Sequence, residues 1–270
     1  MQENQIKLTF AAMQAAIEQK QSVDVMTLLN SAGETQMLLL YKNGEIVGEI
    51  INLDFTNKIK SYQKNHSWNK PVLFTLVDAQ GASQQIFWDR VLPQPKVMIL
   101  GAGHISRSLA SILAILEYEV IVADDRPDFA NAKSFPTAQV VLCDSFENII
   151  SQLKPTVDVN TAVVIVTRGH RYDFLCLKNF LRVNFGYLGM IGSKSRVKGT
   201  MQILREEGED PIRLAQIHAP IGIAIAGQSP AEIAVSIAAE LIDVFNGGDS
   251  PLGRLDGGLT NGHNINSSCL

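Results

Sequence analysis

The segment from Lys96 to Asp125 most narrowly limits what this chain can fold into. An apolar run, KVMIL, leads into the turn Gly101-Ala102-Gly103, which is followed by a helical stretch and a second apolar run, EVIVAD. A strand, a glycine turn, a helix and a second strand form the opening unit of a Rossmann-like sheet. Gly101 permits the tight turn, and Gly103 lets a pyrophosphate approach the backbone. The segment therefore predicts a parallel α/β sheet with an anion-binding turn.

Two acidic residues, Asp124 and Asp125, end the second apolar run. Asp124 stands about 20 residues beyond the turn, where a carboxylate can accept hydrogen bonds from a ribose. An acid there favours NAD over NADP, although Arg126 weakens that preference. Ser106 takes the place of the third glycine in the pattern, so we expect some crowding between helix and strand. His104 either orients the phosphate loop or faces the ligand, and the sequence leaves both interpretations open.

Three more apolar runs follow, at residues 139–143, 161–167 and 187–192, and helical stretches separate them. Continuous apolar runs are typical of strands buried on both faces, as in a parallel sheet with helical crossovers. Ser229 then opens a long apolar helix, with proline next to it and Glu232 three residues on. These residues predict a capping box, in which Glu232 has a structural role.

The first 92 residues show a different pattern. Ile6, Phe10, Met13 and Ile17 recur at helical spacing and predict an amphipathic helix over residues 5–19.

Two strand pairs follow this helix. Residues 36–41 and 45–53 are joined by Lys42-Asn43-Gly44, and an Asn-Gly pair accepts positive φ at both central positions of a tight hairpin. The second pair, 71–78 and 83–91, is joined through Ala79-Gln80-Gly81. Antiparallel strands therefore dominate this part of the chain.

The predicted fold is α/β, with a small α+β domain of antiparallel strands before a Rossmann-like domain. Prolines at positions 93 and 95 form a stiff connector between the two. We expect an N-terminal domain over residues 1–92, a Rossmann-like domain over 96–246, and a flexible tail, rich in Gly, Asn and Ser, over 247–270.

Composition excludes several classes of protein. Hydrophobic residues make up 46% of the chain and charged residues 19%, which excludes a disordered protein. A net charge of −4 gives no general attraction for nucleic acid. No apolar run approaches the roughly 18 residues of a membrane span, and the N-terminus lacks the pattern of a signal peptide. Three separated cysteines predict neither a disulfide framework nor a zinc site, which is typical of a protein in the reducing cytoplasm. We therefore expect a cytoplasmic protein, and the charge and the short apolar runs predict no nucleic-acid or membrane partner.

The loop after the run 161–167 carries several polar residues. Loops at the carboxyl ends of parallel strands line the ligand crevice of an open sheet. The planar fork of Arg168 suits a phosphate or carboxylate, and His170 adds a side chain that can change its charge. Arg171 is interpreted as a solvated loop charge, and Asp173 could orient a histidine or cap the next helix.

Two later turns are further candidates. Gly192, Ser193 and Lys194 offer an anion their backbone amides, a hydroxyl and an ammonium group, but the same residues fit an ordinary serine-capped helix. Their spacing does not match a Walker motif. His218 lies in a rigid, proline-containing turn at residues 217–222. Three separated histidines do not predict a metal site, and we expect no metal.

The stretch from about residue 90 to 246 resembles the xanthine dehydrogenase accessory protein family, also called XdhC/CoxI. The residues that carry the resemblance are ILGAGHISRSLA, ADDRPDFAN, TRGHRYDFLCL, YLGMIGSKSRV and HAPIGIAIAGQSPAEIAVSIAAELI. The N-terminal third resembles the family only in its hairpin. Asn52-Leu53-Asp54 stands roughly where the family has Gly-Gly-Cys, so the N-terminal domain is divergent or shortened.

Members of this family look like maturation chaperones for molybdenum hydroxylases such as xanthine dehydrogenase. The resemblance implies that this chain binds the molybdenum–pterin cofactor, keeps it available while a cysteine desulfurase replaces an oxo ligand by sulfur, and hands it to the apo-enzyme. No catalytic triad or carboxylate pair is evident, so we expect an accessory protein that acts as a homodimer. Two alternatives stay open: an NAD(H)-binding sensor or scaffold module, and an NAD-dependent oxidoreductase.

Taken together, the motifs and the resemblance give one set of candidate cofactor-binding residues. These residues are Gly101, Gly103, His104, Ile105, Asp124, Asp125, Arg168, Gly169, His170, Gly192, Ser193, Lys194 and His218, and the family pattern adds Gly189.

Overall fold

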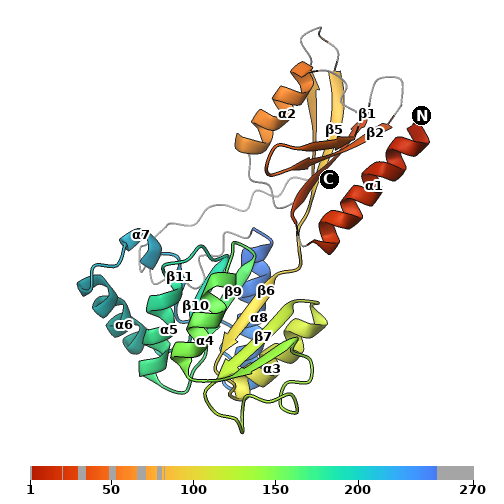
Figure 1. Ribbon diagram of the computed structural model, residues 1–270. Coiled ribbons are helices and arrows are strands. Elements are labelled where there is room, and N and C mark those ends of the chain that lie inside the picture. Colours follow the sequence, from red (N-terminus) through yellow and green to blue (C-terminus); the bar gives the residue numbers. More distant parts are fainter. Residues whose placement is uncertain are drawn as a thin grey trace.

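The computed structural model describes residues 2–19, 21–29, 35–48, 53–65, 71–77, 81 and 83–247, and contains two β-sheets (Figure 1). Asn52, the Ala79-Gln80 part of the second predicted turn and the predicted tail beyond Gly247 lie outside these residues. None of the helices within the described ranges combines the length and apolar character that a membrane span requires.

The first sheet is antiparallel, with the strand order β3-β2-β1-β5-β4. Its strands are β1 (Val23–Leu29), β2 (Thr35–Tyr41), β3 (Ile46–Gly48), β4 (Val72–Val77) and β5 (Ser83–Val91). Helix α2 (Leu53–Asn65) packs on one face through Phe55 and Ile59, and α1 (Gln2–Glu18) packs on the other through Met13 and Ala16. Each helix buries apolar side chains that alternate along the strands.

Both predicted antiparallel pairings are confirmed, but the first differs in detail. Strand β3 ends at Gly48, whereas the sequence predicted a strand to residue 53, and Leu53 already begins α2. Only Gly44 has a positive φ, of 85°, whereas the sequence predicted positive values at both Asn43 and Gly44. The Tyr41 N–H donates to the Glu45 carbonyl at 2.9 Å, and the Gly44 N–H donates to the Tyr41 carbonyl at 2.9 Å. These bonds close a turn of three residues, in which one glycine suffices.

Helix α1 is present, but its apolar stripe faces solvent more than predicted. Ile6, Phe10 and Ile17 are 43%, 50% and 51% exposed. Of the four predicted residues, Met13 packs against the sheet, beside the smaller, buried Ala16. The helix therefore packs through a face rotated away from its largest apolar side chains.

The second sheet is parallel, with the strand order β11-β10-β9-β6-β7-β8. Its strands are β6 (Lys96–Leu100), β7 (Glu119–Asp124), β8 (Val140–Cys143), β9 (Thr161–Ile165), β10 (Tyr187–Met190) and β11 (Ile217–His218). The first five coincide with the five predicted apolar runs, so the Rossmann-like α/β fold is confirmed.

Helices cover both faces of this sheet and give three layers (Figure 1). One face packs against α3 (His104–Ile115) and α8 (Pro230–Phe245). The other packs against α4 (Phe146–Leu153), α5 (His170–Phe180), α6 (Lys194–Glu206) and α7 (Pro211–Leu214), and a short 3-10 helix, η1 (Lys154–Thr156), follows α4. Val97 and Ile99 point toward α3 and α8, whereas Met98 and Leu100 point toward the opposite layer.

The strand order reverses beside β6. The chain runs outward from β6 through β7 to β8, and then returns to place β9 on the other side of β6. Ligands of open α/β sheets bind outside the carboxyl ends of the strands at such a switch point. The turns after β6, β7 and β9 meet there, and we call residues 101–105, 124–126 and 166–170 the switch-point edge.

Candidate functional site

The glycine turn after β6 is packed directly against the chain that follows β9. Gly101 has a φ of +111°, and its N–H donates to the Ala123 carbonyl at 2.7 Å. A Cβ at this position would lie 2.4 Å from the carbonyl oxygen of Val166, well inside contact distance. Both the backbone conformation of Gly101 and the close approach of Val166 therefore require glycine at this position.

Ser106 strengthens this turn. Its side chain is fully buried, and its hydroxyl donates to the Gly101 carbonyl at 2.6 Å. The crowding expected from a serine in place of the third glycine is thus offset by a bond that fastens the first turn of α3 to the glycine turn.

Two helices begin at the switch-point edge without a side-chain cap. The N-cap residues of α3 and α5 are Gly103 and Gly169, which have no side chain to offer. Side chains do cap the other α-helices around this sheet: Ser145 caps α4, Ser193 α6, Asp210 α7 and Ser229 α8. An uncapped N-terminus presents backbone N–H groups and a partial positive charge, both of which favour an anion.

Space for a ligand is available beside the first of these helices. A Cβ on Gly103 would find no atom within 4 Å, in contrast to the crowded Gly101. His104 and His170, the first residues of α3 and α5, are both exposed, and Ile105 is half-buried against the α3/α8 layer.

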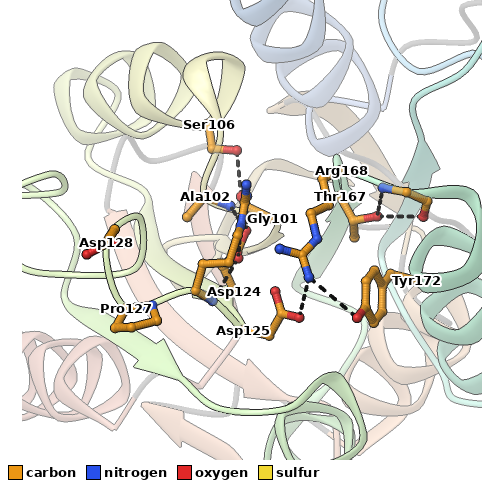
Figure 2. Close-up of polar contacts among 12 residues, drawn as sticks. Gly101, Ala102, Ser106, Asp124, Asp125, Pro127, Asp128, Thr167, Arg168 and Tyr172 are labelled. Atoms are coloured by element: carbon orange, nitrogen blue, oxygen red, sulfur yellow. Dashed lines mark hydrogen bonds and ion pairs between the residues drawn. The ribbon is translucent and has the colours of Figure 1, made fainter.

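The Asp124 carboxylate is fully engaged by the protein itself (Figure 2). It accepts the Ala102 N–H at 2.7 Å, the Arg126 N–H at 3.1 Å, and the Arg126 Nε and Nη2 groups at 2.8 Å each. Burial raises the pKa of Asp124, but the bonds from Arg126 and Ala102 outweigh burial and lower it overall. Asp124 therefore ties the glycine turn to the end of β7, and a ribose would have to compete with these bonds.

Asp125 and Arg168 form an ion pair, also drawn in Figure 2. Arg168 Nη2 lies 2.8 Å from Asp125 Oδ2, and the guanidinium carbon lies 5.4 Å from the centre of the Tyr172 ring. The second carboxylate oxygen of Asp125, Oδ1, is buried and has no hydrogen-bond partner. Because this oxygen is covered, it can receive a donor from a ligand only if the carboxylate turns.

Asp173 anchors the loop after β9. It is fully buried, accepts the Thr167 hydroxyl at 2.5 Å, and pairs with Arg196 of α6 at 2.7 Å. Burial raises the pKa of Asp173 despite these partners. Sequence reasoning offered a helix cap or a histidine partner for this residue and missed both Thr167 and Arg196. Thr167 is the polar residue that ends the apolar run 161–167, a position that could have drawn attention to it.

Ser193 acts as an ordinary helix cap. Its hydroxyl accepts the Arg196 N–H at 3.3 Å, while Lys194 is exposed and Gly192 is half-buried. The N-terminus of α6 is thus already capped, in contrast to those of α3 and α5.

His218 belongs to a buried cluster beside α8. Its Nδ1 lies 3.1 Å from Glu240, and its ring lies 4.4 Å from that of Tyr187. Glu240 also accepts the Tyr187 hydroxyl at 2.5 Å and the Gly222 N–H at 2.6 Å. This cluster joins β10, β11 and α8, whereas the switch-point edge is built from the ends of β6, β7 and β9.

The predicted histidines do not gather into a metal site. Within the described part of the chain, no group of three or more His, Cys, Asp or Glu side chains is arranged to hold a metal ion.

Replacing Glu240 by alanine should destabilise the fold by about 3 kcal/mol, because the buried Tyr187 hydroxyl and Gly222 amide would lose their acceptor. Urea unfolding of the E240A variant measures this loss. Removal of an exposed carboxylate, as in E206A, should change the free energy of unfolding by no more than about 0.5 kcal/mol. Equal urea midpoints for the two variants would show that the cluster contributes little.

Comparison with known proteins places these residues in a family context. The profile of the XdhC Rossmann domain matches residues 97–241. The chain is 28% identical over 167 residues to the uncharacterized protein YqeB of Escherichia coli K12, and 29% identical over 157 residues to a protein of Bacillus subtilis 168 described as a probable xanthine dehydrogenase component. These matches cover 62% and 58% of this chain, but only 30% and 45% of those longer proteins.

A solved structure supports the fold. A crystal structure described as a xanthine dehydrogenase from Bacillus halodurans superimposes with a TM-score of 0.64 at 20% identity. The superposition covers 86% of this chain and 65% of that one. At this coverage the similarity extends beyond the parallel sheet into the residues that precede it.

Proposed function

The chain belongs to the XdhC Rossmann-domain family, and from that premise we propose that it is an accessory protein that binds the molybdenum–pterin cofactor for a molybdenum hydroxylase of the xanthine dehydrogenase type. The observation that carries this proposal is the pair of uncapped helix N-termini, α3 and α5, on either side of the switch point. The family match spans every residue of the switch-point edge.

The chemistry of the switch-point edge fits the proposed ligand. The first-turn amides of α3 and α5 and the guanidinium of Arg168 would hold the phosphate and other anionic oxygens. The open space beside Gly103 would admit the phosphate close to the backbone, and the unpartnered Oδ1 of Asp125 would accept an N–H of the pterin ring. When bound, the cofactor supplies the molybdenum centre whose oxo ligand is exchanged for sulfur. The chain binds and orients this group.

A nicotinamide dinucleotide is the alternative ligand, either for a sensor or scaffold module or for an oxidoreductase. The glycine turn would suit its pyrophosphate, but the usual ribose acceptor, Asp124, already accepts bonds from Arg126 and Ala102. This commitment of Asp124 favours a ligand that needs no ribose contact at the end of β7.

The proposed partners are the client hydroxylase, a cysteine desulfurase and a second copy of this chain, all in the cytoplasm. The curated relatives are longer, and the matched part of this chain covers less than half the length of either one.

Retention of the cofactor during gentle purification tests this function. The full chain is produced in a host that makes the molybdenum–pterin cofactor and in a matched host blocked in its synthesis. Bound molybdenum is measured by mass spectrometry, and pterin is measured by fluorescence after oxidation. We expect both to approach one per chain from the first host only. Neither molybdenum nor pterin above the level of the blocked host would refute the proposal, and NAD found in their place would support the alternative.

A further inference from the structure

The Arg168–Asp125 ion pair crosses the switch-point edge. Arg168 follows β9, Asp125 follows β7, and β6 with its glycine turn lies between those two strands. The 2.8 Å contact between the two side chains therefore joins the outer loops over the carboxyl end of β6. We call this ion pair the strap.

Both members of the strap can change partners. The Arg168 side chain is 43% exposed, and Asp125 uses only one of its two carboxylate oxygens in the pair. Ion pairs with this exposure are weak, so an incoming anion can replace Asp125 at the guanidinium. The Tyr172 hydroxyl lies 3.5 Å from Arg168 Nη2, so Arg168 has a second contact that does not depend on Asp125.

The second acid–arginine pair differs in strength. Asp124 is 2% exposed and holds Arg126 through both carboxylate oxygens, while the Arg126 guanidinium also stacks on Phe129 at 3.9 Å. Arg126 is therefore fixed, and Arg168 is the cation of the two that can turn to a ligand.

We propose that Asp125 is a gating residue, which competes with the anionic ligand for Arg168 and so sets the affinity of the site. This inference rests on the proposed function, since it assumes that the switch-point edge binds an anion. Ligand binding transfers Arg168 from Asp125 to the ligand and leaves both oxygens of Asp125 free to accept donors from it. Asp125 thereby couples the arrival of an anion to the recognition of an N–H or O–H group.

Calorimetric titration of the full chain with pyrophosphate, at about 0.15 M salt, tests the proposal. D125N removes the competitor while keeping the size of the side chain, and should bind pyrophosphate about two- to fivefold more tightly than the wild type. D128N is the matched control, because Asp128 is an exposed acid three residues along the same loop. It removes the same charge without touching Arg168, and screening at this salt concentration should hold its effect below that of D125N.

Arg168→Gln separates the strap from a general charge effect. R168Q should bind pyrophosphate more weakly than the wild type, and adding D125N to R168Q should bring no gain beyond the small general charge effect measured with D128N. Equal affinities in D125N and D128N would overturn the strap alone. So would a gain from D125N that stays larger than the D128N effect when Arg168 is absent. No binding by the wild type or any variant would overturn the anion site, and with it both the proposed function and the strap.

Discussion

Replacing Gly101 by alanine should destabilise the protein by about 3–5 kcal/mol and lower its Tm by about 10 °C. The φ of +111° is unfavourable for any residue with a Cβ, and that atom would meet the Val166 carbonyl oxygen at 2.4 Å. The Cβ position is fixed by the backbone of residue 101, and the atom it meets is a backbone oxygen, so no side-chain rotation relieves the clash. Scanning calorimetry of the purified G101A variant measures the loss.

Gly199 provides the matched control for this variant. It lies within α6, and a Cβ there would find no atom within 4 Å. G199A should leave the Tm unchanged or raise it slightly, because alanine is the better helix former. A loss of 1 kcal/mol lowers the Tm of a chain of this size by about 2 °C. If the Tm of G101A lay within about 2 °C of the wild-type value, the glycine turn would not be built as described.

Replacing Gly103 by valine should remove ligand binding while the fold stays intact. The backbone at Gly103, with φ of −78° and ψ of −169°, is open to any residue, and the space around it is empty. The valine side chain would occupy the room that the phosphate needs. We expect at least a tenfold loss of affinity for pyrophosphate, about 1.4 kcal/mol, and loss of retained molybdenum and pterin. The cost to stability should not exceed about 1 kcal/mol.

A serine at the same position makes the test sharper. In G103S the hydroxyl would cap α3, which should stabilise the fold by a few tenths of a kcal/mol, about the difference between serine and glycine caps. The same hydroxyl would accept a hydrogen bond from a first-turn N–H of α3 that the ligand needs, so the affinity for pyrophosphate should fall. Undiminished binding in both G103V and G103S would show that the ligand does not approach the N-terminus of α3.

The parallel sheet could be predicted because its strands are buried on both faces. Apolar runs such as Val120 to Ala123 carry no polar interruption, and the glycine turn fixes where the first crossover begins. The cap of α8 was equally readable: Ser229 and Glu232 form the predicted capping box, since both partners lie within one turn of sequence.

The antiparallel sheet was harder to predict. Strand β1, its central strand, was missed because Asp24 interrupts the apolar pattern of VDVMTLL. In the structure Asp24 is buried but pairs with Arg90, its partner across β5, at 2.6 Å, and accepts a bond from Gln63 of α2. The partners of Asp24 lie 39 and 66 positions away in the sequence, so no pattern near Asp24 indicates that its charge is compensated. Helix α2 was also missed. It meets the sheet through Phe55, Ile59 and Tyr62, and the polar residues between them hide the helical spacing.

For the candidate site, the sequence indicated positions but not partners. The switch-point edge brings together Gly101, Asp124, Asp125 and Arg168, and Gly103 begins α3 at the same edge. That Asp124 is committed to Arg126, that Asp125 holds Arg168, and that His218 turns toward Glu240 all depend on side-chain orientation across the sheet. Asp125, Arg126 and Arg168 lie in loops beyond the ends of β7 and β9, where the alternation of faces along a strand no longer fixes the direction of a side chain.

The backbone amide resonances of the full chain, followed by NMR during anaerobic titration with the isolated molybdenum–pterin cofactor, test the central claim most directly. We predict that the largest shifts fall on the amides of Gly103, His104, Ile105, Gly169 and His170, the first turns of α3 and α5. The amides of Ser193 to Arg196 at the capped start of α6 should change little. Shifts centred on α6 or on the Glu240 cluster, with the first turns of α3 and α5 unmoved, would contradict the account.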